Sequence, residues 1–403
     1  MSNDTQPEIR FPGFTDDWEQ RKLGDFVVDY VEKTSVQNQF PMLTSSQQKG
    51  IVLQEDYFAN RQVTTENNIG YFVLPRGYFT FRSRSDNDVF VFNRNDIIDR
   101  GIISYFYPVF TLKSADSDFF LRRINNGIQR QLSIQAEGTG QHVLSLKKFK
   151  NIVAMFPSEE EQQKIGTFFK QLDDTIALHQ RKLDLLKETK KGFLQKMFPE
   201  NGAKVPEIRF PGFTEDWEER KVFEISKVTY GGGTPKTNTK EFWNGNIPWI
   251  QSSDLEINRL FNVSPKKKIT NEAVKKSAAK IIPPNSIAIV TRVGVGKLAL
   301  MPFEYATSQD FLSLSELQID SYFGIFSLYS MLQKELKNIQ GTSIKGMTKS
   351  DLLEKKVTIP KKYEEQQKIG NFFKQLDDMI ALHQRKLDLL KETKKSFLQK
   401  MFV

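Results

Sequence analysis

The segment EEQQKIGTFFKQLDDTIALHQRKLDLLKETKKGFLQKMF, residues 160–198, occurs a second time at residues 364–402. The two copies lie 204 residues apart and differ at three of 39 positions. A second repeat, PEIRFPGFTDDWEQRK from Pro7, returns as PEIRFPGFTEDWEERK from Pro206. The segments between these repeats barely resemble each other. A duplicated frame with unlike inserts predicts a pseudo-symmetric protein that presents two different surfaces.

The repeated 39-residue segment is predicted to be one long α-helix. It contains no proline and at most two glycines, each of which costs about 1 kcal/mol in a helix. Ser158 followed by Glu161 resembles a capping box at its start. Apolar residues recur at alternating steps of four and three, which indicates a coiled-coil seam, and each helix would be about 58 Å long. The seam residues are Ile165, Phe169, Leu172, Ile176, His179, Leu183 and Leu186 in the first copy, and Ile369, Phe373, Leu376, Ile380, His383, Leu387 and Leu390 in the second.

The two predicted helices are expected to pair with each other, because each apolar seam would otherwise stay exposed. Pseudo-twofold symmetry relates the repeats like the halves of an isologous dimer and favours an antiparallel pair. Full overlap of the two copies would place His179 near His383. We interpret these two histidines as polar seam residues that set the register of a coiled coil.

Composition limits the class of protein. The 403 residues leave room for two to four domains, and 33 phenylalanines argue against disorder. No apolar run is long enough to span a bilayer, and the start does not resemble a secretion signal, so no membrane association is expected. The absence of cysteine excludes disulfides, zinc–thiolate sites and thiol catalysis, and it fits a cytoplasmic location. A net charge of +9 favours an anionic partner.

The two inserts are predicted to be α+β domains. Aromatic and β-branched residues alternate within them between Gly, Pro and Asn-Asp turns. Helical patterns appear in the second insert at residues 271–280 and 322–339. The expected segments are an N-terminal repeat (1–25), a first globular domain (26–157), a central helix (158–199), a linker with the second repeat (200–225), a second globular domain (226–360) and a C-terminal helix (361–403).

Few residues are suited to catalysis. The chain has three histidines, two of them on the seam, and His142 lacks a companion at metal-ligand spacing, so it is expected to be a surface or turn residue. RVGVGK at Arg292 to Lys297 lacks the first glycine and the hydroxyl of a phosphate-binding loop. GGGTPK at Gly231 lacks the strand–turn–helix context of a dinucleotide loop. The sequence therefore predicts binding, with no catalytic residue and no metal site.

Several loops of the inserts combine glycine with side chains that donate hydrogen bonds to phosphates or base edges. Arg82, Arg84 and Arg292 suit bidentate contacts to guanine, and Gln141 suits adenine. Residues 265–280 hold six lysines against one acid, a surface that would neutralise phosphates without reading sequence. For any one of these residues, the alternative is a solvated loop side chain. The candidate DNA contacts are Ser45, Arg82, Arg84, Arg94, Thr139 and Gln141 in the first insert, and Lys236, Ser252, Lys267, Arg292, Lys297, Thr342 and Lys345 in the second.

With these features, the chain resembles the specificity subunits of Type I restriction–modification systems over essentially its full length. The resemblance rests on the repeated W-x-x-R-K at Trp18 and Trp217 and on the EEQQKI that opens both helices. The phrases FWNGNIPWIQSSDL and SAAKIIPPNSIAIVTRVGVGKLAL of the second insert complete it. It implies an α+β fold in which two long antiparallel coiled-coil helices join two target recognition domains.

The resemblance also implies a function. Each domain would read one half of a bipartite site in double-stranded DNA, while the helices set the spacing and dock two modification subunits. Those subunits would carry S-adenosylmethionine and methylate adenine, and two restriction subunits would use ATP and Mg, so this chain would hold no cofactor. A scaffold whose inserts bind proteins is the alternative, and salt-sensitive binding of duplex DNA would separate the two. A single-chain methylating enzyme would need motifs that the sequence lacks.

Overall fold

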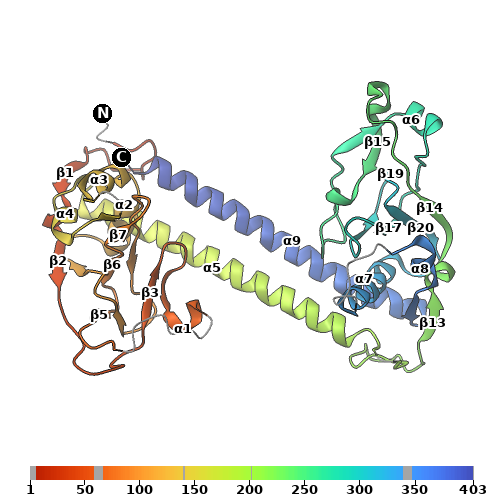
Figure 1. Cartoon of the computed structure of the whole chain (residues 1–403), viewed down its shortest axis with the longest axis horizontal. Coiled ribbons are helices and arrows are strands. Elements are labelled where there is room, and N and C mark those ends of the chain that lie inside the picture. The colour runs from red at the N-terminus through yellow and green to blue at the C-terminus, as the bar shows by residue number, and fades with distance from the viewer. Residues whose placement is uncertain (1–5, 59–66, 139–140, 201, 339–346, 403) are drawn as a thin grey trace. The chain divides into compact units, whose positions relative to one another are not determined.

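The computed structural model describes residues 6–58, 67–138, 141–200, 202–338 and 347–402. The chain divides into two compact units: unit 1 comprises Met1–Gln180 with Arg385–Val403, and unit 2 comprises Arg181–Gln384. Two long helices, α5 (Glu159–Lys196) and α9 (Tyr363–Lys400), each contribute one part to each unit (Figure 1). Both predicted long helices are therefore confirmed.

Unit 1 is built around a four-stranded antiparallel sheet. Its strand order is β2 (Val27–Tyr30), β10 (Val109–Leu112), β6 (Phe79–Phe81) and β8 (Phe92–Arg94). The other strands form antiparallel pairs: β1 (Glu19–Lys22) with β12 (Val153–Phe156), β3 (Leu43–Ser46) with β4 (Gly50–Leu53), β5 (Phe72–Pro75) with β9 (Arg100–Ile103), and β7 (Arg84–Ser85) with β11 (His142–Val143). The short helices are α1 (Gln54–Tyr57), α2 (Ser117–Asn125), α3 (Gln129–Gln135) and α4 (Leu146–Lys150).

Unit 2 contains a sheet of the same form, in the order β14 (Ser226–Gly231), β20 (Phe311–Leu317), β17 (Ser286–Val290) and β18 (Leu298–Met301). A further sheet has the order β16 (Lys267–Ile269), β15 (Trp243–Ile250) and β19 (Ala306–Thr307), and β13 (Glu218–Lys221) pairs with β21 (Lys356–Ile359). The helices are α6 (Asn271–Lys276), α7 (Ser321–Asn338) and α8 (Lys349–Glu354).

The two units share one frame. The order β2-β10-β6-β8 recurs as β14-β20-β17-β18, and the β1–β12 pair recurs as β13–β21. The α+β fold class with two globular domains is thus confirmed. The helix expected over residues 271–280 is shorter than predicted and ends at Lys276. The Ser277 hydroxyl accepts a hydrogen bond from the Ala279 N–H (3.1 Å), and such a local bond competes with the helix.

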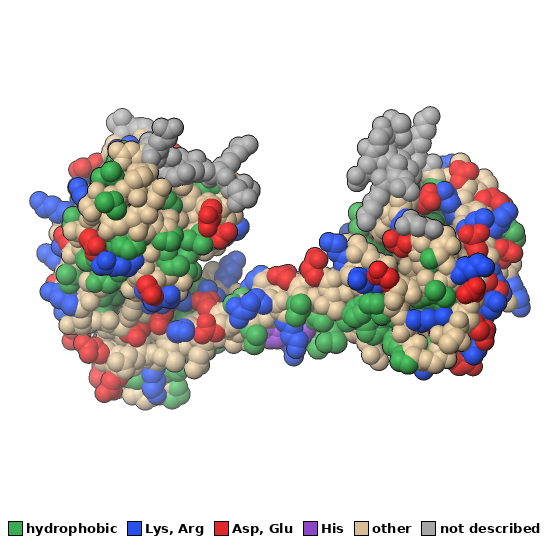
Figure 2. Space-filling view, turned by 90° about the horizontal axis from the view of Figure 1, so that it is seen from below, with side chains coloured by type: hydrophobic (Ala, Val, Ile, Leu, Met, Phe, Trp, Pro, Cys, Tyr) green, Lys and Arg blue, Asp and Glu red, His purple; other side chains and the backbone are tan. Residues whose placement is uncertain are grey.

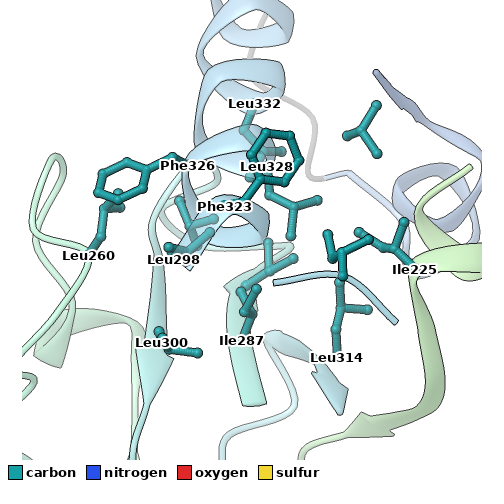
Figure 3. Close-up of a cluster of buried hydrophobic side chains, with 14 of the residues drawn as sticks. Ile225, Leu260, Ile287, Leu298, Leu300, Leu314, Phe323, Phe326, Leu328 and Leu332 are labelled. Carbon is teal, nitrogen blue, oxygen red and sulfur yellow. The ribbon is translucent and has the colours of Figure 1, made fainter. Parts of the chain in front are cut away.

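The core of unit 2 explains why β17 is buried along its whole length. Phe323, Phe326, Leu328 and Leu332 of α7 pack over one face of the sheet (Figure 3). Alternate side chains of β17 point to opposite faces, so Ile287 joins this cluster. Its neighbours Ala288 and Val290 join a second buried cluster on the other face.

Parts of α5 and α9 pack antiparallel within each unit. In unit 1 the rings of Phe168 and Phe397 have centroids 5.1 Å apart, and Asp173 Oδ1 lies 2.5 Å from Lys394 Nζ. As the residue number rises along α5, the number of its partner in α9 falls. The same antiparallel order is found in unit 2. Lys190 Nζ lies 2.5 Å from Asp377 Oδ1, and the rings of Phe193 and Phe372 have centroids 5.1 Å apart. All fourteen predicted seam residues are buried or partly buried, and the proximity of His179 to His383 stays a prediction.

Two glycines of the long helices allow a second helix to begin against them. A Cβ on Gly166 would lie 2.1 Å from Asp116 Oδ1, and one on Gly370 would lie 2.5 Å from the Phe323 nitrogen. These glycines are therefore required by packing.

The capping box predicted at the start of α5 is half right. The Ser158 hydroxyl accepts from the Glu161 N–H (3.4 Å). The Glu161 carboxylate, however, accepts two hydrogen bonds from Arg10 (2.7 and 2.8 Å) instead of closing the box. The first sequence repeat is thereby tied to the first long helix.

Candidate DNA-binding surfaces

Arg82 and Arg84 follow β6 in unit 1 and are exposed. Ser83 between them donates its N–H and its hydroxyl to the Phe106 carbonyl (3.0 and 2.8 Å), which fixes the backbone here. The Arg84 guanidinium carbon lies 4.3 Å from the centre of the Phe106 ring, a stacking contact that holds the guanidinium in place. We call the adjacent cavity of about 200 Å³ the Arg84 hollow; it is lined by Gln47, Arg82, Arg84, Ser85, Asp86 and Asn87.

Other predicted contacts of unit 1 have different surroundings. Gln141 donates to Asp86 Oδ1 (3.0 Å) and so lies at the rim of the Arg84 hollow. The Ser45 hydroxyl accepts from Asn93 Nδ2 (2.8 Å). Arg94 does not present a free guanidinium, because it pairs with Asp96 and Asp118 (both 2.7 Å). Thr139 lies outside the described residues.

Burial and nearby charge act on the side chains close to Arg82. Burial raises the pKa of Tyr107, and the positive charge of Arg82 partly offsets this rise. His142 lies in β11 and pairs with Asp88. It is therefore a partly exposed side chain of a strand, which fits the surface residue that we expected but not the turn residue. Within the described ranges, no group of three His, Asp or Glu residues is placed to hold a metal ion.

The predicted contacts of unit 2 fall into small groups. Lys297 Nζ donates to the Ser252 carbonyl (3.1 Å), so these two residues are neighbours. Lys267 Nζ lies 5.6 and 5.7 Å from the ring centres of Trp243 and Trp249. Trp243 Nε1 also donates to the Lys236 carbonyl (3.2 Å).

Three further candidates of unit 2 remain. Arg292 is exposed just after β17, at the end of the strand that corresponds to β6. Thr342 and Lys345 fall in a segment that the structure does not describe. Arginines thus follow the equivalent strand in both units.

The sequence matches the Type I restriction modification DNA specificity domain at residues 15–188 and 214–392. The chain belongs to this family. The matched domain is named for DNA specificity, so the chain is a Type I specificity subunit. The two matched ranges each contain one of the unlike inserts, together with most of one long helix.

Individual proteins of Type I systems are also similar to this chain. The MjaIX specificity subunit of Methanocaldococcus jannaschii is 30% identical over 193 residues, which are 47% of this chain and 44% of that protein. The match thus spans about half the length of that relative. A crystal structure of the Type I S subunit from M. genitalium is 12% identical with a TM-score of 0.63, and covers 99% of both chains. A chain from a structural study of type I R-M complex assembly is 17% identical, with a TM-score of 0.51 and coverage of 98% and 99%. These two structures show that the fold is shared.

The surface of the specificity subunit is not uniformly basic. Figure 2 shows acidic and basic side chains interspersed over the visible face of each unit. Within the lysine-rich segment 265–280, Lys276 pairs with Glu272 (2.6 Å). The one acid of this segment therefore neutralises one of its six lysines. Among the described helices of at least 18 residues, none is apolar enough to cross a membrane.

Three functional candidates have no signal in the sequence. Gln47 reaches the Arg84 hollow from the turn between β3 and β4, far from Arg82 along the chain. Phe106 orients Arg84 from the loop between β9 and β10. Lys349 is the first residue of α8. It is a candidate only because the fold places other basic side chains near it.

Proposed function

We propose that this specificity subunit reads a bipartite site in double-stranded DNA, with one half-site for each globular domain. The observation that supports this most is a shared frame with unlike loops. Both units have the same four-stranded sheet, yet β6 is followed by Arg82 and Arg84 whereas β17 is followed by Arg292. A common scaffold with different side chains at the strand ends suits two readers of different base sequences. We assign the readers to residues 26–157 and 226–360.

The Arg84 hollow is our candidate for direct reading of a base. A guanidinium presents two parallel N–H donors to O6 and N7 of guanine in the major groove. The contact with Phe106 limits the motion of Arg84 before DNA binds, so less side-chain entropy is lost on binding. Gln47 and Gln141 add amide groups beside it.

The two long helices are proposed to set the distance between the half-sites. Each has 38 residues, which corresponds to about 57 Å of helix. One turn of DNA, about 34 Å, is shorter than this.

The helices are also proposed to dock two modification subunits. Leu178 and Leu185 are exposed on α5 (57% and 67%), and their repeat partners Leu382 and Leu389 are exposed on α9 (43% and 64%). Identical apolar positions on both copies would let one chain recruit two copies of one partner. S-adenosylmethionine would then belong to the modification subunits, and ATP and Mg to two restriction subunits, in a cytoplasmic complex.

A domain exchange tests the proposal. Residues 26–157 are replaced by the corresponding domain of another Type I specificity subunit, and methylated adenines are mapped in cells that carry the modification subunits. We expect one half-site to change while the other half-site and the gap stay the same. Changes in both half-sites would contradict the assignment of one reader to each domain. Binding of duplex DNA that does not weaken with salt would favour a protein-binding scaffold instead.

A further inference from the structure

We propose that Lys280, Arg292 and Lys349 of unit 2 form a site that binds the phosphate backbone of duplex DNA. We call this set the Lys349 cluster. The inference rests on the proposed DNA-reading function and names the part of the nucleic acid that this surface contacts. Arg292 was expected from the sequence to contact a base, and Lys280 is one of the six lysines of residues 265–280 that were expected to neutralise phosphates. Lys349 was not expected to contact DNA.

The glycines at the end of β14 bring two of these lysines together. A Cβ on Gly231 would lie 2.7 Å from Lys349 Nζ, so the ammonium group lies directly against the Gly231 backbone. A Cβ on Gly233 would lie 2.4 Å from the Ala278 carbonyl carbon, and Lys280 follows two residues later. The close backbone approach that glycine permits therefore places both lysines beside one strand end.

Arg292 follows the end of β17 at the same edge of the sheet, because Gly231 pairs with Leu312 of β20 and Val290 pairs with the adjacent Phe311. The N–H and the hydroxyl of Thr291 both donate to the Asp310 carbonyl (2.7 and 3.0 Å). This fixes the residue before Arg292 against the loop that leads into β20. The Asp310 carboxylate is thus the acidic group among three basic side chains, since Arg292, Lys280 and Asp310 all act electrostatically on Lys349.

The positive charges of the cluster are not balanced. The pKa of Lys349 is lowered, first by burial and then by the positive charges of Arg292 and Lys280, while Asp310 acts in the opposite direction. Among the described residues, no carboxylate lies within ion-pair distance of Lys349. Two other lysines near α8 are neutralised instead, because Lys355 pairs with Glu335 (2.5 Å) and Lys221 with Glu354 (2.7 Å). A bound phosphate would supply the missing negative charge.

The corresponding helix of unit 1 shows that the fold does not require a lysine here. Ser145 caps α4 as Thr348 caps α8, each accepting a hydrogen bond from an N–H three residues later. The first helical residue is Leu146 in α4, where it packs against the core, and Lys349 in α8. A leucine at this position is compatible with the fold of unit 1. We therefore attribute the lysine of unit 2 to the binding of DNA phosphates. Lysine acts as a point charge, which suits a phosphate better than a base edge.

The test measures DNA binding by the full chain assembled with its modification subunits, over a series of salt concentrations. One duplex contains the recognised site and another has a random sequence. Lys280→Gln and Lys349→Gln should each lower the slope of log affinity against log salt by about 0.9 on both duplexes. The matched control, Lys221→Gln with Lys355→Gln, should leave the slope within error of wild type. If Lys349→Gln does not fold, Lys349→Leu replaces it in the measurement, because leucine occupies the equivalent position in unit 1.

The outcomes separate this inference from the proposed function. Unchanged slopes in both cluster variants, with normal sequence preference, would overturn the phosphate site and leave the reader of DNA intact. A wild-type complex that shows no preference for either duplex would overturn the proposed function itself. Inorganic phosphate is titrated in parallel. Tight phosphate binding that the variants lose, with DNA slopes unchanged, would assign the site to a free anion and contradict our inference.

Discussion

Lys190 of α5 lies 2.5 Å from Asp377 of α9 in unit 2, measured from Nζ to Oδ1. Their repeat partners form the same contact in unit 1, where Lys394 lies 2.5 Å from Asp173. Each pair joins one long helix to the other, so the same two positions specify antiparallel pairing in both units. The surroundings differ, because Arg122 also binds Asp173, whereas Asp377 Oδ2 makes no hydrogen bond to any described residue.

Removal of the lysine alone should destabilise unit 2. Lys190→Met leaves a largely buried carboxylate without its partner, and we expect a loss of about 3 kcal/mol in the free energy of unfolding. Lys190→Met combined with Asp377→Leu should recover most of this loss, because no buried charge then remains. Urea denaturation of the three proteins measures both effects. A single variant as stable as wild type would show that the pair is not important for packing.

The same pair predicts a pH dependence. Burial raises the pKa of Asp377 above its usual 3.8, and Lys190 opposes this rise. The folded state then holds its proton at a pH where the unfolded chain has lost it. The stability from this carboxyl is therefore fully present below about pH 4 and is lost as the pH rises through the folded-state pKa. In Lys190→Met, this loss should extend to higher pH, as measured by unfolding free energies across a pH series. Asp377→Asn in the same background should abolish the difference.

The helical glycines should respond unequally to alanine. Gly166→Ala and Gly370→Ala place a Cβ within 3 Å of Asp116 or of Phe323 backbone atoms, so each should destabilise its unit by roughly 1–3 kcal/mol. Gly192 has no neighbouring atom within 4 Å, and Gly192→Ala should stabilise the protein by up to about 1 kcal/mol. Thermal unfolding monitored by circular dichroism compares the three. Equal effects at all three positions would rule out the packing explanation.

Two equivalent buried arginine–glutamate pairs should differ in their tolerance of mutation. Glu161 is bound by Arg10, while Glu365 is bound by Arg209 and also accepts from Trp217 Nε1 (3.3 Å). The corresponding Trp18 Nε1 has no partner in the described structure. Arg10→Met should therefore cost more than Arg209→Met, with about 3 kcal/mol expected for the former. Denaturant unfolding of both variants measures this order, and the reverse order would contradict it.

Deletion of one heptad from the middle of both long helices should shorten the recognised gap. Seven residues correspond to about 10 Å of helix, and therefore to about three base pairs. We expect both half-sites to persist, since neither globular domain is altered, and methylated-base mapping reads the result. Deletion from one helix only serves as the control and should impair assembly, because the two seams then fall out of register. An unchanged gap in the double deletion would refute the spacing role.

Much of the fold could be predicted from the chain because its signals are local or repeated. Helix propensity and seam spacing act over a few residues, and near-identity of the two copies implies symmetry. The seam from Ile165 to Leu186 and its copy from Ile369 to Leu390 were found in this way, and so was the antiparallel packing seen within each unit.

Which basic side chains remain available at the candidate sites depends largely on tertiary structure, although Asp96, two residues from Arg94, is a local partner. Arg94 and Lys349 look alike in sequence as basic residues of polar segments. Folding brings Asp118 from another element to neutralise Arg94, whereas it gathers Arg292 and Lys280 around Lys349. Whether a side chain is free to bind DNA depends on partners that are distant along the chain. No local pattern encodes the distant partners, such as Asp118 for Arg94, so long-range packing contributes to which basic residues remain unpaired.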